Sequence, residues 1–264
     1  MDSSCTCVLS RTVRFEVSPV HEPTQATNTH SANPMCDGIG AWFEATVRCC
    51  GTPDQRTGMV QDIHHIDALL RTQLVELLRA ALITPSTSPG DVLRAFVEGL
   101  GPEALAMESI NLCLNPRRSV TLHTATMHDI LLTHQYQFAA SHRLHNPALD
   151  QAQNEAIFGK CSRESGHGHN YWVEVDVVAP IDGCFTRNAM DTIVQQTIID
   201  RFDHRNLDVD CEEFKAVLST VEHITIICHN LLVDPIAKAG GTLRQVRVWE
   251  SQRTWASYPA EPAP

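Results

Sequence analysis

The segment 170–179 alternates well between an apolar side and a mostly polar side, and this pattern leaves the chain few ways to fold there. One side of the segment carries Tyr171, Val173, Val175 and Val177, and the other side carries Trp172, Glu174 and Asp176. A period of two residues is that of a β-strand with one buried face, whereas an α-helix repeats every ~3.6 residues. We therefore expect a sheet whose apolar face is covered by other elements.

Two histidines directly precede this strand, at His167 and His169, and a third, His142, lies 25 residues before the first of them. Because side chains two positions apart on an extended chain point the same way, both imidazoles face one side of the strand. Three neutral imidazoles leave the fourth position of tetrahedral zinc for water or substrate, which is typical of catalytic zinc. A His-x-His pair alone is common without metal, but His142, the strand and the neighbouring Cys161 together favour a catalytic zinc site.

Charge and composition exclude several classes of partner. The net charge of −11 disfavours nucleic-acid backbones and anionic membranes, and no apolar run approaches the roughly 20 residues of a membrane span. The first residues lack the basic and apolar regions of a secretory signal, so we expect a cytoplasmic protein whose ten cysteines are reduced thiols. Cys5-Thr6-Cys7 and Cys49-Cys50 have no second pair at zinc-finger spacing, and we interpret them as ordinary thiols.

The second half of the chain reads as two strands, two helices and two strands. The strands are expected at 135–141, 170–179, 243–250 and 254–258, and a polar loop between the first two leads to Cys161. One helix begins with Asn188 as its N-cap, and the next begins near Ser219, where Ser219 and Glu222 fit a capping box. This ββααββ order predicts an α+β fold, with an antiparallel sheet and both helices on one face.

The first half repeats this order. Its strands are expected at 13–17, 41–47, 110–114 and 120–124, and its two helices begin after Asp62 and at Ser88-Pro89. The strand around Trp42 echoes the strand around Trp172. The chain therefore reads as a tandem duplication with a seam near Met127, which divides it into residues 1–127 and 128–264.

The two copies differ in their metal ligands. When the matching aromatic residues of the strands are aligned, other residues take the three histidine positions in the first copy: Pro19, Asp37 and Ile39. The first copy also has no Asp-His pair after its first helix. We expect it to be a degenerate, structural repeat without metal.

Six blocks of the second half, in the same order, resemble the 6-pyruvoyl-tetrahydropterin synthase family, which also contains the 6-carboxytetrahydropterin synthases of queuosine biosynthesis. The resemblance covers about residues 134–258 and rests on Phe138-Ala139-Ala140-Ser141-His142-Arg143-Leu144, Phe158-Gly159-Lys160-Cys161, Gly166-His167-Gly168-His169-Asn170-Tyr171, Asp203-His204-Arg205-Asn206-Leu207-Asp208, Ser219-Thr220-Val221-Glu222 and Val248-Trp249-Glu250. It implies the tunnelling fold, in which ββααββ units join their sheets into oligomeric barrels. Here there would be two tandem units.

The resemblance also implies a role for nine residues. The zinc ligands would be His142, His167 and His169. The catalytic residues would be Cys161, Asp203 and His204. The substrate contacts would be Glu250, whose carboxylate accepts two hydrogen bonds from the pterin ring, with Thr220 and Glu222 beside it.

The substrate that the resemblance implies is 7,8-dihydroneopterin triphosphate. Zinc would hold the side-chain hydroxyls while Cys161 moves protons on the adjacent carbons. Two products stay open: 6-pyruvoyl-tetrahydropterin, or 6-carboxytetrahydropterin with acetaldehyde. The six-position step from Cys161 to His167 and the Phe-Gly-Lys-Cys lead-in resemble the pyruvoyl enzymes more closely.

The same resemblance implies an oligomer in which each pocket lies between neighbouring units of a three-membered ring. Because the first repeat has no Asp-His pair, the economical arrangement is a homotrimer with one catalytic barrel and one silent barrel. The rival is a side-by-side pairing of both repeats in one ring, as in urate-oxidase-like proteins.

Two other functions compete with a zinc-dependent lyase. One is a non-catalytic pterin- or purine-binding oligomer that retains its zinc, against which the intact set Cys161, Asp203 and His204 argues. The other is GTP cyclohydrolase chemistry on a related fold, which would need thiolate zinc ligands, whereas all three ligands here are histidines.

Overall fold

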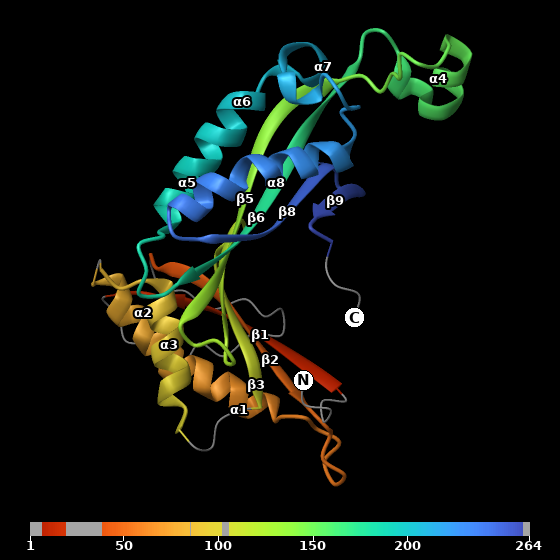
Figure 1. Ribbon diagram of the computed structural model, residues 1–264. Helices are drawn as coiled ribbons and strands as arrows, with labels where there is room; N and C mark the ends of the chain where they lie inside the picture. The colour runs from red at the N-terminus through yellow and green to blue at the C-terminus, as the bar shows by residue number, and fades with distance from the viewer. Residues whose placement is uncertain (1–6, 20–38, 85, 102–105, 261–264) are drawn as a thin grey trace. The chain divides into compact units, whose positions relative to one another are not determined.

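The computed structural model describes residues 7–19, 39–84, 86–101 and 106–260, and these form an α+β fold with antiparallel strands. The chain divides into two compact units (Figure 1). The first consists of Met1–Leu132 and Pro180–Asp182, and the second of Thr133–Ala179 and Gly183–Pro264. The predicted strands are all present, and most of them run longer than the sequence pattern indicated.

The first unit contains four strands in the order β1-β2-β3-β4, each antiparallel to the next. They are β1 (Cys7–Val17), β2 (Ala41–Gly51), β3 (Met107–Asn115) and β4 (Arg118–His123). Alternate residues of these strands are fully buried, including Val13, Ala45, Val47, Ile110 and Leu122. The sheet of this unit therefore has one apolar face, as the alternation predicted.

Helices cover the apolar face of the first unit (Figure 1). The first runs through α1 (Ile63–Leu69), a π-helical turn (Leu70–Leu74) and α2 (Val75–Leu82), and the second is α3 (Pro89–Gly99). Asp62 caps α1, and Ser88 and Asp91 form a capping box at α3, where Pro89 sits in the first turn. Both predicted helix starts are confirmed.

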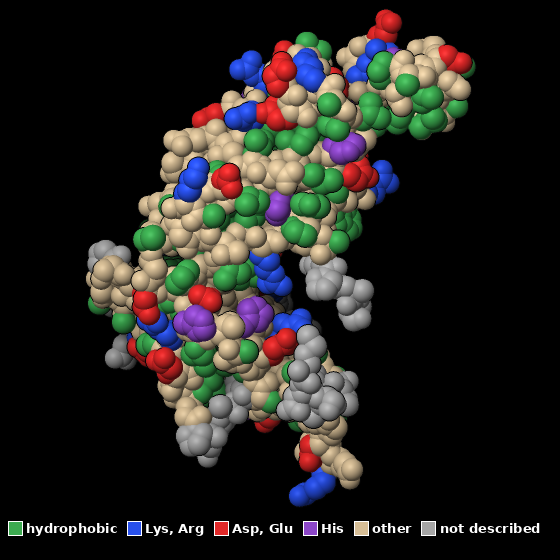
Figure 2. All heavy atoms as spheres, in the orientation of Figure 1, with side chains coloured by type: hydrophobic (Ala, Val, Ile, Leu, Met, Phe, Trp, Pro, Cys, Tyr) green, Lys and Arg blue, Asp and Glu red, His purple; other side chains and the backbone are tan. Residues whose placement is uncertain are grey.

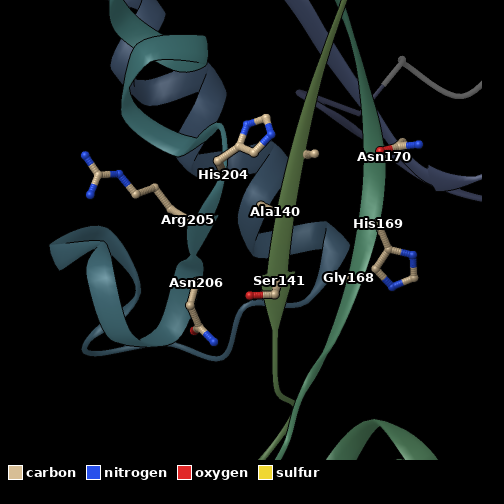
Figure 3. Close-up of a pocket in the computed structure, with 9 residues that line it drawn as sticks. Ala140, Ser141, Gly168, His169, Asn170, His204, Arg205 and Asn206 are labelled. Carbon is tan, nitrogen blue, oxygen red and sulfur yellow. The ribbon is translucent and has the colours of Figure 1, made fainter.

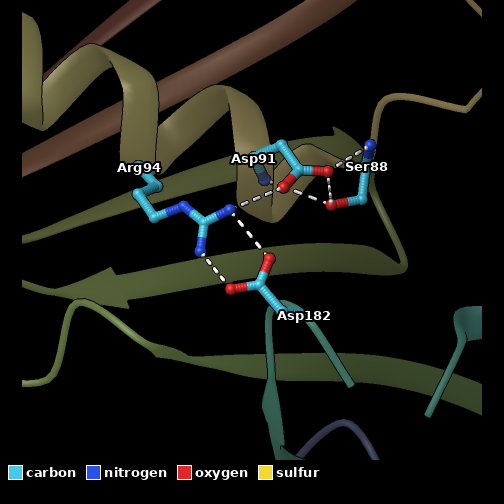
Figure 4. A network of polar contacts seen from close by, with 4 residues as sticks. All are labelled: Ser88, Asp91, Arg94 and Asp182. Atoms are coloured by element: carbon cyan, nitrogen blue, oxygen red, sulfur yellow. Dashed lines mark hydrogen bonds and ion pairs between the residues drawn. The ribbon is translucent and has the colours of Figure 1, made fainter. Parts of the chain in front are cut away.

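The segment Pro180–Asp182 is fastened to α3 by an ion pair with two hydrogen bonds (Figure 4). The Arg94 guanidinium donates to both carboxylate oxygens of Asp182, at 2.7 and 2.9 Å, and to Asp91 at 3.1 Å. Asp91 in turn accepts from the Ser88 backbone and hydroxyl. The capping box of α3 thus also positions the arginine that binds Asp182.

The second unit is built on β5 (Asp129–His142), which begins in the first unit, and on β6 (His167–Pro180), β8 (Thr242–Ser251) and β9 (Thr254–Tyr258). Their order is β5-β6-β8-β9, and the two-residue strand β7 (Arg205–Asn206) pairs in parallel with β5. The predicted apolar stripe of β6 is fully buried, and it consists of Tyr171, Val173, Val175 and Val177.

Helices again cover one face of this sheet (Figure 1). The first runs through α5 (Arg187–Val194), a π-helical turn (Gln195–Ile199) and α6 (Asp200–Phe202), and α8 (Val221–Lys238) follows the short α7 (Leu207–Asp210). Two predicted caps are wrong by one or two residues. Thr186 caps α5 in place of Asn188, and Thr220 caps α8 in place of Ser219. In both cases a threonine hydroxyl accepts from the backbone N–H three residues on.

One helix was not predicted. The segment expected to be a polar loop contains α4 (Gln151–Phe158), which projects beyond the other helices of its unit in Figure 1. A capping box of Asp150 and Gln153 begins it. The buried Asn154 amide donates to three backbone carbonyls, those of Asn146, Leu149 and Asp150. Polar contacts, not an apolar stripe, therefore hold this helix, which is why hydrophobic periodicity did not reveal it.

On the face shown in Figure 2, acidic and basic side chains are interspersed over both units. Among the described residues, no helix combines the length and the apolar character that crossing a membrane would require. The expectation of reduced thiols throughout is wrong at Cys50, which takes part in a disulfide. Its neighbour Cys49 is a free, buried thiol, and burial raises its pKa to about 11.

Candidate active site

Three imidazoles meet where β5 ends and β6 begins. His142 is the last residue of β5, and His167 and His169 are the first and third residues of β6. All three side chains lie on the helix-covered face, because His142 keeps the parity of the buried Phe138 and His169 keeps that of Tyr171. One ligand nitrogen from each lies within 4.8 Å of the others. The structure therefore brings together the three histidines that the sequence singled out.

Hydrogen bonding fixes the orientation of His142, whose side chain is buried. Its Nδ1 donates to the Ser219 carbonyl at 2.7 Å, because a carbonyl can only accept. The remaining lone pair is on Nε2, which lies 3.1 Å from Nε2 of His167. Nitrogen ligands about 2.0–2.1 Å from a tetrahedral zinc are about 3.3 Å apart, so this spacing fits two ligands of one metal.

The other two rings leave buried nitrogens available. Nε2 of His169 is buried and has no hydrogen-bond partner among the described residues, and the same holds for Nδ1 of His167, which is not the nitrogen that lies near His142. Burial lowers the pKa of His142 and of His167, and the neighbouring imidazoles lower both further. A lowered pKa keeps imidazole neutral, which is the form that binds metal. The donor set and its protonation therefore fit a divalent metal that prefers nitrogen.

Tyr171 extends this cluster and was not assigned a role from the sequence. Its ring lies 5.5 Å from that of His169 and 6.1 Å from that of His142, measured between centroids. Its hydroxyl is buried without a hydrogen-bond partner in the described part of the chain. Burial, and then the charge of Glu250, raise its pKa, so the hydroxyl stays protonated. Strand alternation could have revealed it, since it follows His169 on the same face.

Cys161 lies in a 3-10 turn (Gly159–Ser162) that connects α4 to β6, and it is a free, half-buried thiol. The residues that follow His142 hold this turn: Leu144 N–H donates to the Cys161 carbonyl at 2.9 Å, and Arg143 Nε donates to the Ser162 carbonyl at 2.8 Å. Backbone bonds thus tie the thiol-bearing turn to the end of β5, directly after a candidate metal ligand.

Gly166 closes the same loop before His167. It adopts φ +61°, and a Cβ there would lie 2.8 Å from the His142 carbonyl oxygen. Both facts require glycine, because an L side chain disfavours this φ and would clash with backbone. This glycine lets the chain turn closely enough for His167 to reach His142.

Asp203 and His204 form an ordered pair at the end of α6. The His204 Nδ1 lies 2.7 Å from Asp203 Oδ2, and the His204 side chain is 83% exposed. His204 has φ 57°, and its N–H donates to the Ala139 carbonyl at 2.6 Å. Ala139 N–H donates back to Asp203 Oδ1 at 2.8 Å, and this bond, more than the His204 ring, lowers the pKa of Asp203. The backbone of β5 therefore holds the carboxylate charged and the imidazole outward.

The Asp203–His204 pair and the two histidines of β6 lie along opposite edges of β5. The pairing of β7 with Ala140 and Ser141 places His204 along one edge, and His169 on β6 lies along the other (Figure 3). A cavity of about 470 Å³ lies over this region and is lined by residues 139–141, 168–170 and 204–206. No hydrogen bond or ion pair joins Cys161 to the pair within the described residues. The described contacts therefore join Asp203 to His204 and do not join Cys161 to either of them.

The three predicted substrate contacts lie on β8 and at the start of α8. Glu250 is half-buried in β8, and its charge raises the pKa of both His167 and Tyr171, so it faces the imidazole cluster. Thr220 caps α8, and Glu222 is exposed in its first turn. The predicted capping box of Ser219 and Glu222 is wrong, since the Ser219 hydroxyl donates to Asp208 at 2.6 Å.

The chain is similar to a known family of enzymes. The family model for 6-pyruvoyl tetrahydropterin synthase matches residues 131–261. A 6-pyruvoyl tetrahydrobiopterin synthase of Drosophila melanogaster is 37% identical over 132 residues, which are 48% of this chain and 77% of that protein. The human protein of the same description is 36% identical over 136 residues, 49% of this chain and 91% of that protein.

A solved structure of 6-pyruvoyl tetrahydropterin synthase from Caenorhabditis elegans matches 50% of this chain and 96% of that chain, with 30% identity and a TM-score of 0.47. The family match begins within β5 and ends after β9, so it contains the imidazole cluster, Cys161, the Asp203–His204 pair and Glu250. The chain belongs to the 6-pyruvoyl tetrahydropterin synthase family.

Proposed function

We propose that the second unit is a zinc-dependent lyase that acts on 7,8-dihydroneopterin triphosphate, releases triphosphate and gives 6-pyruvoyl-tetrahydropterin. The observation that carries this proposal is the cluster of His142, His167 and His169, with ligand nitrogens within 4.8 Å and one ring fixed by a buried carbonyl. The names of the relatives, which are pterin synthases, support the same substrate class.

The three histidines would hold the metal, and their chemistry favours zinc. Three neutral nitrogen donors are a common catalytic zinc set, and softer or oxygen-preferring metals select other ligands. When bound, zinc supplies a Lewis acid that polarises the hydroxyls of the substrate side chain. The buried surroundings of His142 exclude water from one side of this position.

Cys161 is proposed as the base that takes a proton from a side-chain carbon of the substrate. Loss of this proton lets the C–O bond to triphosphate break, and triphosphate leaves with the bonding electrons. The resulting enol takes up a proton on carbon and becomes the first ketone. The carbon that bears the hydroxyl next to the ring then gives up its C–H and O–H hydrogens to N5 and C6 of the ring, so that this carbon becomes the second ketone and the dihydropterin becomes a tetrahydropterin. The side chain is oxidised as the ring is reduced, so no external oxidant or reductant is needed. The Asp203–His204 pair would accept and return protons, with Asp203 orienting the ring through the 2.7 Å contact.

Glu250 is proposed to anchor the pterin ring. Its carboxylate can accept from a ring N–H and from the amino group together, which fixes the ring in one orientation. The half-buried position of Glu250 near His167 supports this role, since an anchor beside the metal sets the distance from ring to reacting side chain. Thr220 and Glu222 would border the same pocket from α8.

We infer that a neighbouring copy of the chain completes each pocket. The support is that His204 is 83% exposed and lies along the edge of β5 away from His169. An outward imidazole, oriented by a carboxylate, is suited to meet a thiol from another chain. The proposed assembly is a homotrimer in which the three second repeats, residues 128–264, close one catalytic barrel. The three first repeats, residues 1–127, are proposed to be degenerate, to bind no metal and to close a second, silent barrel.

Complementation tests the shared pocket. Cys161→Ala and His204→Ala should each be inactive alone, and coexpression should restore partial activity, because mixed oligomers contain some pockets with both wild-type residues. Native mass spectrometry would establish that mixed oligomers form. Mixed oligomers without any recovered activity would mean that one chain supplies all three residues.

The identity of the product is tested separately. Incubation of the purified protein with 7,8-dihydroneopterin triphosphate should release triphosphate without acetaldehyde. Acetaldehyde in amounts equal to triphosphate would assign the 6-carboxytetrahydropterin reaction instead. Binding of the substrate without any triphosphate release would favour the non-catalytic pterin-binding protein.

A further inference from the structure

Asp208 is half-buried and lies at the centre of a hydrogen-bond network that the proposed chemistry does not use. It belongs to α7, whose N-terminus is capped by the Asn206 side chain. Its two carboxylate oxygens accept from donors in two different segments: Oδ1 from the Ser219 hydroxyl at 2.6 Å, and Oδ2 from the Arg143 backbone N–H at 2.5 Å. A carboxylate that accepts a short hydrogen bond on each oxygen is held in place by both donors, and it holds both donors in place.

One arm of the network ends on a candidate metal ligand. Ser219 is fully buried, and its carbonyl accepts the Nδ1 hydrogen of His142 at 2.7 Å. Asp208 therefore fixes the position of Ser219, and the Ser219 carbonyl fixes the orientation of the His142 ring and keeps its hydrogen on Nδ1. Groups that hold a ligand imidazole from behind orient its free lone pair, and their loss weakens metal binding.

The other arm ends on the turn that carries Cys161. Arg143 directly follows His142, and the bond from its N–H to Asp208 fixes the backbone there. The Arg143 side chain donates to Ser162, and the next residue, Leu144, donates to Cys161. The Asp208 carboxylate therefore fixes the backbone at Arg143, and Arg143 and Leu144 in turn hold the turn that carries Cys161.

We propose that Asp208 is a positioning residue that couples the metal-binding imidazole of His142 to the turn that carries Cys161. This inference rests on the proposed function, because it assumes that the three histidines bind metal. A carboxylate suits the role because a backbone N–H can only donate and each oxygen can accept. Asparagine would keep one acceptor oxygen, and alanine would keep none.

The test measures the zinc affinity of the metal-free protein by competition with a coloured chelator. Asp208→Ala should weaken zinc binding by about 10- to 100-fold, and Asp208→Asn should recover part of this loss. Ser219→Ala should weaken it less, and Asp208→Ala with Ser219→Ala should be no weaker than Asp208→Ala alone, because both changes break one path.

Asp210→Ala is the matched control. Asp210 lies in the same short helix, and its carboxylate accepts only from the Asn206 N–H among the bonds described. The Asp210→Ala variant loses the same charge but no bond to Asp208, Ser219 or Arg143. Its zinc affinity should therefore stay within about two-fold of wild type, by the usual size of surface effects. Thermal unfolding of each metal-free variant separates loss of fold from loss of metal binding.

The outcomes distinguish this inference from the proposed function. Wild-type protein that binds no zinc would overturn the metal site itself. Tight binding by wild type and equally tight binding by folded Asp208→Ala would overturn the positioning role alone. If Asp208→Ala does not fold, Asp208→Asn and Ser219→Ala carry the test, and wild-type affinity in both would contradict the inference.

Discussion

The two units of this chain share their backbone features and differ in their chemical ones. Each has two strands, two main helices and two further strands, and in each the first main helix is interrupted by a π-helical turn, at Leu70–Leu74 and at Gln195–Ile199. Such turns are rare, so their presence in the corresponding helix of both units is a specific likeness.

Strand irregularities repeat as well. The pairing of β2 with β3 shifts between Arg48 and Cys49, and that of β6 with β8 shifts between Asp176 and Val177. The closing hairpins shift between Cys113 and Asn115 in the first unit and between Trp249 and Ser251 in the second. These shared bulges support the proposed duplication, since bulges tend to persist within families.

The bulges also correct the alignment that the aromatic residues suggested. Counted from them, Glu44 rather than Trp42 corresponds to Trp172, because each pairs with the matching residue of its hairpin, Cys113 or Trp249. His167 and His169 then correspond to Ile39 and Ala41, and Glu250 corresponds to Leu114. The two units share this backbone geometry, although all three of these polar side chains differ between them, so fold and chemistry are specified by separate sets of residues.

The largest effect is expected from removing a metal ligand. His167→Ala should leave the protein without stably bound zinc and without activity, because two remaining imidazoles hold zinc poorly. The control is His123→Ala in the first unit, which should change neither zinc content nor turnover. Elemental analysis and a turnover assay on both variants make the comparison. Full zinc content in His167→Ala would show that the cluster is not the metal site.

Removing the Cys161 thiol should reduce the rate nearly as much as removing a metal ligand, but the protein should still bind zinc. Cys161→Ala is expected to lower kcat by about 10²- to 10⁴-fold, the usual contribution of a positioned base. Zinc content and substrate binding should remain. Cys113→Ala, which removes a half-buried free thiol from the first unit, is the control and should keep full activity. Near wild-type kcat in Cys161→Ala would exclude the proposed base.

The structural role of the first unit is tested in its core. Leu74 is fully buried at the end of the first π-helical turn, and Leu232 is fully buried in α8. Leu74→Ala and Leu232→Ala should each lower the free energy of unfolding by about 2–5 kcal/mol. Leu74→Ala should do so without changing zinc affinity at 25 °C. Denaturant titration with a zinc-competition measurement checks both, and weaker zinc binding in folded Leu74→Ala would show that the units are not independent.

The ring anchor is expected to have a smaller effect. Glu250→Gln should lower kcat/KM by roughly 10- to 100-fold, because a hydrogen bond to a charged group contributes about 1.5–3 kcal/mol. The matching change in the first unit, Leu114→Ala, should leave kcat/KM unchanged. Steady-state kinetics on the two variants provides the measurement, and equal values for Glu250→Gln and wild type would remove Glu250 from the pocket.

The smallest expected effect is a change in how the melting temperature depends on pH in acid when Asp203 or Asp182 is replaced. The pKa of Asp203 is lowered by the Ala139 N–H, and that of Asp182 by Arg94. A carboxyl with a lowered pKa stabilises the folded state above about pH 3.9, the unfolded value, and this stabilisation is lost as pH falls through the folded pKa. The melting temperature should therefore fall less steeply below pH 4 in Asp203→Asn and in Asp182→Asn than in wild type. If the melting temperature of a variant falls with pH as steeply as that of wild type, the prediction is contradicted for that variant.

Sequence reasoning identified the parts of this protein that have local signals. Alternation gave the strands, caps gave the starts of α1 and α3, and spacing gave the three histidines, which the structure brings within 4.8 Å. It did not find α4, since a buried Asn154 holds that helix through polar contacts.

Features that depend on distant pairs were also missed. Asp208 was quoted within a motif, but its bond to Arg143 crosses 65 positions of sequence and no local pattern marks it. The Ser219 carbonyl behind His142 lies 77 positions away and belongs to the backbone, so residue type carries no information about it. The placement of His204 on the far edge of β5 required the pairing of β7.

The central claim is that the metal and its chemistry belong to the second unit alone, and zinc content per chain tests it most directly. Protein purified with zinc present and freed of loosely bound ions should contain about one zinc per chain by elemental analysis, as expected for one three-histidine set per chain. Two tightly bound zincs per chain would contradict the account of a first unit without ligands. No bound zinc would contradict the metal site itself.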